Sequence, residues 1–149
     1  MIAFDGNESF PLPAGALFAK LGDAGFLAAC MPDTEVVRAT PDEAVWKSRP
    51  KVSILTGTID TTARVTERRA DGVVRYSVEA MSGYNGATVE AILELIPSDD
   101  GGTRVRWSAR ITGYSGLLKL APSSMVQPAA VKAAAEIWLG VRAKLAAEG

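Results

Sequence analysis

The sequence contains no histidine among its 149 residues. Histidine titrates closest to neutral pH, and it is a frequent general base and metal ligand. Its absence excludes histidine-based catalytic triads and imidazole metal sites, and most hydrolase mechanisms with them. The one cysteine, Cys30, cannot form an internal disulfide or a cysteine-rich zinc site. A lone cysteine also fits a reducing compartment.

The chain also lacks an excess of either charge, because 16 Lys plus Arg stand against 17 Asp plus Glu. Nonspecific nucleic-acid binding therefore has no electrostatic driving force. No apolar run approaches the roughly 18 residues that a membrane span requires, and the first eight residues do not resemble a signal peptide. We expect a cytoplasmic protein that binds no nucleic acid, and we expect no metal and no cofactor.

The length and composition indicate one domain covering residues 1–149. A chain of this size buries about 68% of the surface that its unfolded form exposes. Hydrophobic residues make up 48% of the sequence, which is enough for a substantial core without disulfides or metals.

Three turn dipeptides, Asp71-Gly72, Asn85-Gly86 and Gly101-Gly102, separate segments in which apolar and polar residues alternate. Such dipeptides between alternating segments predict β-hairpins. The alternating segments are 59–65, 74–80, 87–95 and 105–111, and a longer candidate strand covers 44–55. We predict an antiparallel meander with one apolar face and one face in solvent.

Helical patterns occur at the two ends of the chain. Short helices are predicted over 13–21 and 23–30, with Asp23 as the N-cap of the second. A long helix is predicted over 128–147, starting at Pro128, because its apolar residues recur at helical spacing. These residues are Val126, Ala130, Ala133, Ala134, Ile137, Val141 and Leu145. Helices placed outside the run of strands favour an α+β fold.

The side of the long helix that we expect to face the sheet is uneven. It carries small residues at Ala130, Ala133 and Ala134, whereas Ile137 and Trp138 follow near its end. Space for a ligand would remain under the small residues. The alternative is that the alanines let helix and sheet approach closely and leave a packed core.

This order of elements resembles the helix-grip fold of the START-like superfamily. In that fold a curved antiparallel sheet of about seven strands wraps around a long C-terminal helix, and two short helices follow strand 1. The opening motifs are similar to the family of the carbon monoxide dehydrogenase G subunit, and the resemblance covers nearly the whole chain. The motifs are Phe10-Pro11-Leu12-Pro13, Phe18, Leu27-Ala28-Ala29-Cys30-Met31-Pro32, Glu35-Val36-Val37 and Gly101 to Trp107.

The resemblance implies a small domain with an internal apolar pocket that assists molybdenum hydroxylases of the carbon monoxide dehydrogenase type. It also implies access to the membrane or its quinone pool, and thus a location in the cytoplasm with contact at the inner membrane face. Two features depart from the family pattern. Pro122 and Pro128 interrupt the region before the last helix, so we expect that helix either to start late or to be kinked. The glycine-rich stretch of the family is reduced to Gly83-Tyr84-Asn85-Gly86.

The inward-facing side chains of the predicted sheet include no carboxylate and no lysine, which favours a binding protein over an enzyme. Tyr76 and the Trp107 indole could donate hydrogen bonds to a carbonyl of an apolar ligand, or they could be core aromatics with local partners. The predicted ligand-binding residues are Thr61, Ala63, Tyr76, Val78, Val89, Ala91, Trp107, Ala109, Leu117, Leu120, Met125, Ala130 and Ala134. A START-like cyclase or dehydratase is a weaker alternative, because it needs an acid or base in the pocket.

Two surfaces offer further interpretations. The outward strand face carries basic residues at Lys47, Arg49, Lys51, Arg64, Arg75, Arg104, Arg106 and Arg110, with Glu79, Glu90 and Glu94 among them. This face is either solvated and ion-paired or a docking surface for an assembly or recruitment adaptor. The segment Leu117-Leu118-Lys119-Leu120 is either an apolar flap that closes the pocket or touches a bilayer, or a buried helix edge.

Overall fold

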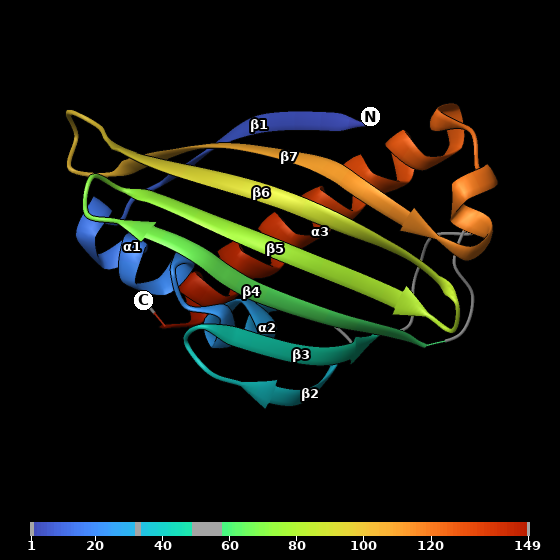
Figure 1. Ribbon diagram of the computed structural model, residues 1–149. Helices are drawn as coiled ribbons and strands as arrows, with labels where there is room; N and C mark the ends of the chain where they lie inside the picture. The colour runs from blue at the N-terminus through green and yellow to red at the C-terminus, as the bar shows by residue number, and fades with distance from the viewer. Residues whose placement is uncertain (1, 32–33, 49–57, 149) are drawn as a thin grey trace.

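The computed structural model describes residues 2–31, 34–48 and 58–148. A single sheet covers one face of a long helix, and two short helices lie at one end (Figure 1). The elements in chain order are β1 Ala3–Phe10, α1 Ala14–Leu21, α2 Ala24–Cys30, β2 Thr34–Ala39, β3 Glu43–Ser48, β4 Ile59–Arg69, β5 Val73–Ser82, β6 Asn85–Pro97, β7 Thr103–Ser115, the 3-10 helix η1 Gly116–Leu120 and α3 Ser123–Glu148. The predicted α+β class, with a curved seven-stranded sheet on a long C-terminal helix, is confirmed.

The strand order is β1-β7-β6-β5-β4-β3-β2, and every neighbouring pair is antiparallel. Strands β2 to β7 follow one another as hairpins, as the alternating segments predicted. Strand β1 pairs with β7, so the first and the last strand in the chain are neighbours in the sheet. Of the strand predicted over 44–55, Glu43–Ser48 forms β3 and the remainder lies outside the described residues.

One predicted turn is wrong. Ser82 pairs with Asn85, so the β5–β6 hairpin turns at Gly83-Tyr84 and not at Asn85-Gly86. Gly83 has a φ of 63°, the left-handed conformation that such a two-residue turn requires. Asn85 and Gly86 already belong to β6. Each of the other two predicted turns contains its glycine with positive φ, 97° at Gly72 and 87° at Gly101.

The two short helices follow the predicted local signals. Asp23 caps α2, because its side chain accepts a hydrogen bond from the Phe26 amide at 3.2 Å. Helix α1 begins after Pro13, whose carbonyl accepts from the Leu17 amide at 3.0 Å. Leu17 and Leu21 of α1 and Ala24 and Ala28 of α2 are fully buried, so both helices cover the same end of the sheet.

Helix α3 begins at Ser123, so the predicted start at Pro128 is wrong. The Pro122 carbonyl accepts from the amides of Met125 and Val126 at 2.9 and 3.1 Å, and these bonds start the helix five residues earlier. Pro128 lies inside the helix, where it has no amide to donate to the preceding turn. The 26 residues of α3 give it a length of about 39 Å.

The side of α3 that faces the sheet differs in part from the prediction. Val126, Ala130, Trp138, Val141 and Leu145 belong to or pack against the two apolar clusters, and Ala134 between them is half-buried. These six residues recur at steps of three and four. Ala133 and Ile137 were expected on this side, but both are exposed. Each precedes an inward residue by one position, and one residue rotates the helix by about 100°.

The buried apolar residues form two separate clusters. The larger cluster contains residues of α1, α2 and the sheet together with Trp138 and Val141 from the C-terminal half of α3. The smaller cluster is centred on Ile2, Ile111 and Val126, near the start of α3. Apolar packing therefore fills both ends of the inner face, by which we mean the sheet face turned toward α3.

Candidate functional site

The inner face carries most of the predicted ligand-binding residues. Thr61, Ala63, Tyr76 and Ala109 are buried there. Val78, Val89, Ala91 and Trp107 on the sheet and Ala130 and Ala134 on α3 are only partly buried. Strand alternation and helix spacing therefore bring ten of the thirteen residues together between sheet and α3, and their role in ligand binding stays a prediction.

The other three predicted residues belong to η1 and the first turn of α3. Leu120 is 82% exposed and Met125 is 50% exposed, so neither side chain packs into the interior. The side chain of Leu117 lies outside the part of the chain that the structure describes. Tyr84 at the β5–β6 turn is 91% exposed. It lies beside η1, since its backbone is so close to Gly116 of η1 that a Cβ there would clash with it.

Val78, Val89 and Ala91 stay partly exposed although they lie on the middle strands β5 and β6 of the sheet. Side chains at such positions are normally covered when a helix packs closely on the sheet. The backbone of α3 comes close to α2 and makes no comparably close approach to a described strand. Ala109 and Ala134 face this middle region and belong to neither apolar cluster. Val78 and Ala91 pack against the larger cluster and Val89 against the smaller one, so small or short side chains lie between the centres of the two clusters.

An aromatic row runs along the seam between β1 and α3. The ring centroids of Trp107 and Trp138 are 6.2 Å apart, and each ring has one phenylalanine neighbour at 6.0 Å, Phe4 and Phe10 respectively. Arg142 of α3 lies over Phe10 at 4.5 Å and donates hydrogen bonds to the Ser9 carbonyl and the Glu8 carboxylate, each at 2.9 Å. The C-terminal half of α3 is therefore fixed to β1.

Trp107 has an unusual polar group within this row. Its indole Nε1 is buried and has no hydrogen-bond partner among the described residues. An indole N–H can only donate, and burying it without an acceptor costs about 1–3 kcal/mol. Native proteins contain few such groups, so this one calls for a physical explanation.

Tyr76 has the local partner that Trp107 lacks. Its hydroxyl donates to the Leu21 carbonyl at 2.6 Å, at the end of α1. Burial raises the pKa of the Tyr76 hydroxyl well above its usual value, so the group remains a neutral donor. Of the two donors that the sequence pointed to, Tyr76 has a structural role here and Trp107 is unpaired.

Acidic and basic groups lie mostly away from the inner face. Glu8 is a carboxylate that the predicted inward set did not include; it faces the β1–α3 seam and is paired with Arg142. Within the described residues, no group of three or more His, Cys, Asp or Glu side chains is arranged to hold a metal ion. No described helix has the length and hydropathy needed to cross a membrane.

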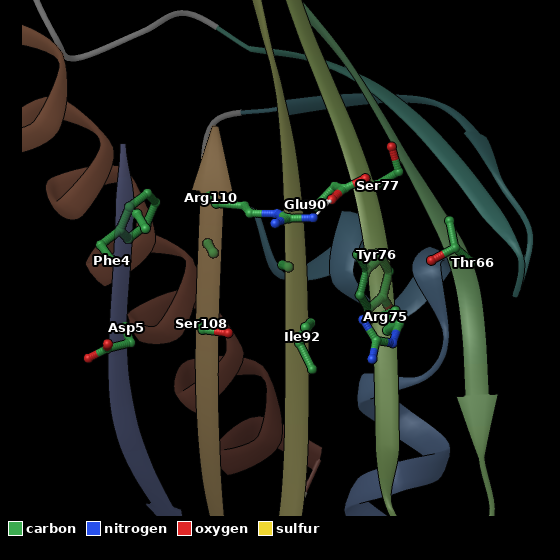
Figure 2. Close-up of a pocket in the computed structure, with 13 residues that line it drawn as sticks. Phe4, Asp5, Thr66, Arg75, Tyr76, Ser77, Glu90, Ile92, Ser108 and Arg110 are labelled. Carbon is green, nitrogen blue, oxygen red and sulfur yellow. Dashed lines mark hydrogen bonds and ion pairs between the residues drawn. The ribbon is translucent and has the colours of Figure 1, made fainter. Parts of the chain in front are cut away.

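The opposite, outer face of the sheet carries a shallow groove of about 510 Å³ (Figure 2). Thr66, Ser77, Ile92 and Ser108 are among the residues that line it. Its arginines are neutralised by neighbours, since Arg110 bonds Glu90 at 2.8 Å and Arg75 bonds Glu67 at 3.0 Å. Arg106 and Arg64 are paired in the same way, with Glu94 and Glu43. These pairs favour the interpretation of a solvated, ion-paired face, and the predicted Arg49 and Lys51 lie outside the described residues.

Comparisons with known proteins identify the family and the fold of the chain. The family model for the carbon monoxide dehydrogenase G subunit (CoxG) matches residues 6–146. No curated protein matches the chain. A conserved protein from Geobacillus kaustophilus has a TM-score of 0.81 at 15% identity, over 97% of this chain and 95% of that chain. A START superfamily protein from Mycobacterium smegmatis has a TM-score of 0.71 at 8% identity, over 99% of both chains.

A third solved structure, the Mll3558 protein from Rhizobium loti, has a TM-score of 0.68 at 14% identity and covers 95% of both chains. At these identities the structural similarities establish the fold alone, and that fold is START-like. The family match spans almost the entire sequence. The chain therefore belongs to the CoxG family, that of the carbon monoxide dehydrogenase G subunit, as its opening motifs predicted.

Proposed function

We propose that the protein is a non-catalytic carrier that holds an apolar small molecule between the sheet and α3. The observation that carries this proposal is the partial exposure of Val78, Val89 and Ala91 in the middle of the inner face, together with the half-buried Ala134 on α3. Burial of apolar ligand surface supplies about 25 cal/mol per Å² before ordering costs are subtracted. A site with apolar walls and few polar groups is typical for small-molecule binding.

We further propose that the ligand is a quinone or a lipid and that the partner is a molybdenum hydroxylase of the carbon monoxide dehydrogenase type. The family membership supports the partner, because the family is named for that enzyme. The mainly apolar walls support a ligand of this class. A carrier of this kind would move an insoluble molecule between the enzyme and the membrane.

The exposed side chains Tyr84, Leu120 and Met125 support transient contact with a membrane at the cytoplasmic face. Lys119 accompanies them, and the described residues of the β5–β6 turn, η1 and the first turn of α3 include no acid. Tyrosine and leucine insert readily at a bilayer surface, and lysine is attracted to anionic headgroups. A Leu120→Ser variant should bind vesicles containing anionic lipid more weakly than the natural protein does. A matched Val37→Ser variant, changed at an exposed site on β2, should bind them unchanged.

Native mass spectrometry and solvent extraction of the purified protein test the carrier function. We expect a co-purifying apolar molecule, or stoichiometric uptake of an added naphthoquinone. Absence of any bound molecule together with no uptake would contradict the carrier function. In a pull-down with the molybdenum hydroxylase, Arg106→Glu and Arg110→Glu should leave capture unchanged; lost capture would favour the recruitment adaptor.

A further inference from the structure

We infer that Trp107 selects ligands that carry a hydrogen-bond acceptor oxygen, and that its indole N–H binds this oxygen. The inference rests on the proposed carrier function and makes it more specific. It predicts that a purely hydrocarbon molecule of the same shape is a poorer ligand. The ligand class is then an apolar molecule with a carbonyl, ether or hydroxyl oxygen near one end.

The indole donor of Trp107 has no hydrogen-bond partner among the described residues. Its Nε1 is sealed from solvent and has no acceptor within the described part of the chain. Phe4 and Trp138 present aromatic rings to Trp107, and the backbone of Gly6 lies beside the indole nitrogen. A donor that has lost its water and gained no acceptor binds an incoming oxygen without having to break an existing hydrogen bond.

Tyr76 differs from Trp107 in this respect. Its hydroxyl is equally buried and lies on the same face, but it already donates to Leu21 at 2.6 Å. A ligand would have to break this bond to use the hydroxyl. Tyr76 therefore offers a matched control, since removing its hydroxyl affects stability and not ligand selection.

Small neighbours give the Trp107 ring access to the proposed ligand space. In this structure the indole lies over Gly6 of β1, and a Cβ there would come within 3.0 Å of Nε1. Ala109 lies on the same face of β7, two residues from Trp107. Ala91 lies on β6, diagonally across from Trp107. The inference requires the ring to turn from β1 toward the middle of the inner face, where Ala109 and Ala91 present only methyl side chains. Turning would bring the N–H into the space that the carrier proposal assigns to the ligand.

The test compares two probes of nearly equal shape, 2,3-dimethyl-1,4-naphthoquinone and 2,3-dimethylnaphthalene. Only the first carries acceptor oxygens. Dissociation constants are measured by calorimetry for the natural protein, Trp107→Phe and Tyr76→Phe. Trp107→Phe keeps an aromatic ring and removes the donor. The indole amides are followed by proton–nitrogen NMR with tryptophan labelled at the indole nitrogen, and the Trp107 signal is assigned by its loss in Trp107→Phe.

We expect the natural protein to bind the quinone about tenfold more tightly than the naphthalene, since a tenfold ratio is the range of one hydrogen bond. Trp107→Phe should reduce this ratio to near one, whereas Tyr76→Phe should leave it unchanged. The Trp107 indole proton should shift downfield with the quinone and not with the naphthalene.

The ratio of the two affinities separates donor loss from general damage, because misfolding weakens both probes alike. If both probes bind with a ratio that Trp107→Phe does not change, the inference is overturned and the carrier function stands. The inner-face hydroxyl of Thr61 would then be the next candidate donor. If neither probe nor any extracted lipid binds, both the carrier function and the inference are contradicted.

Discussion

Gly6 on β1 provides the space in which the Trp107 indole lies, because a Cβ at Gly6 would come within 2.8 Å of Trp107 Cζ2. The two residues face each other across the β1–β7 pair. A Gly6→Ala substitution should therefore displace the indole and destabilise the protein by about 1–3 kcal/mol through overpacking. Urea unfolding measures this change.

Gly15 in α1 is the matched control for Gly6, because a Cβ there would meet no atom within 4 Å. Gly15→Ala should leave stability unchanged or raise it by up to about 1 kcal/mol, as alanine favours helix. Equal effects of the two substitutions would contradict the close packing of Gly6 against the indole.

The bond from Tyr76 to the Leu21 carbonyl leads to a second prediction. Tyr76→Phe should lower the free energy of unfolding by about 1–2 kcal/mol, because the Leu21 carbonyl loses its donor in a buried setting. Thermal and urea unfolding measure the loss. An unchanged stability would mean that water replaces the hydroxyl and that the site is less enclosed than its burial indicates.

Ala134 allows a direct test of the ligand space that we propose under α3. Ala134→Leu should fill this space, weaken naphthoquinone binding at least tenfold and change stability by less than about 1 kcal/mol. Ala133→Leu is the matched control on the exposed side of the same helix, and it should leave binding unchanged. If the interior is already filled, Ala134→Leu will instead destabilise the protein by about 1–3 kcal/mol through overpacking.

The buried Cys30 thiol predicts a decline of stability at high pH. Burial raises the pKa of the thiol from 9.0 to about 11. Between these values the unfolded chain releases a proton that the folded chain retains, so the free energy of unfolding falls as pH rises. Well below pH 9.0 both states keep the proton and the thiol contributes no pH dependence.

The measurement for Cys30 is the difference in unfolding free energy between the natural protein and Cys30→Ala as a function of pH. Because other groups titrate in both proteins, this difference isolates the thiol. It should be constant up to about pH 9 and decline above it, following the pKa values of the two states. A difference that stays constant through pH 11 would show that the thiol ionises equally in both states.

Much of the fold could be predicted because strand alternation and helix spacing are local patterns. Val74, Tyr76 and Val78 alternate with polar residues, and this alone placed their side chains on one face of a strand. The helix start was harder, because proline favours a first helical position and is disfavoured inside a helix, so Pro128 indicated a start and not an interior residue. The bonds from Met125 and Val126 to the Pro122 carbonyl decide the outcome, and sequence does not reveal them.

The candidate site could be predicted in part. Alternation placed Trp107 and Ala109 on the inner face, but the pairing of Trp107 with Gly6 depends on contact between residues about 100 positions apart. The location of Phe4, Phe10 and Glu8 beside α3 depends on the same long-range pairing, so sequence alone did not predict it. Alternation within β1 at positions 4, 6, 8 and 10 was the available signal for these residues. Whether a buried donor finds an acceptor depends on the packed structure and cannot be derived from pattern.

The central claim is that the inner face is hollow beneath the small residues of α3. Xenon binds in empty apolar cavities, so crystals of the ligand-free protein under xenon pressure locate such a space directly. We predict an anomalous difference peak between Ala91, Ala109 and Ala134. A well-ordered crystal without xenon at this position, with side chains filling the region from sheet to helix, would contradict the account.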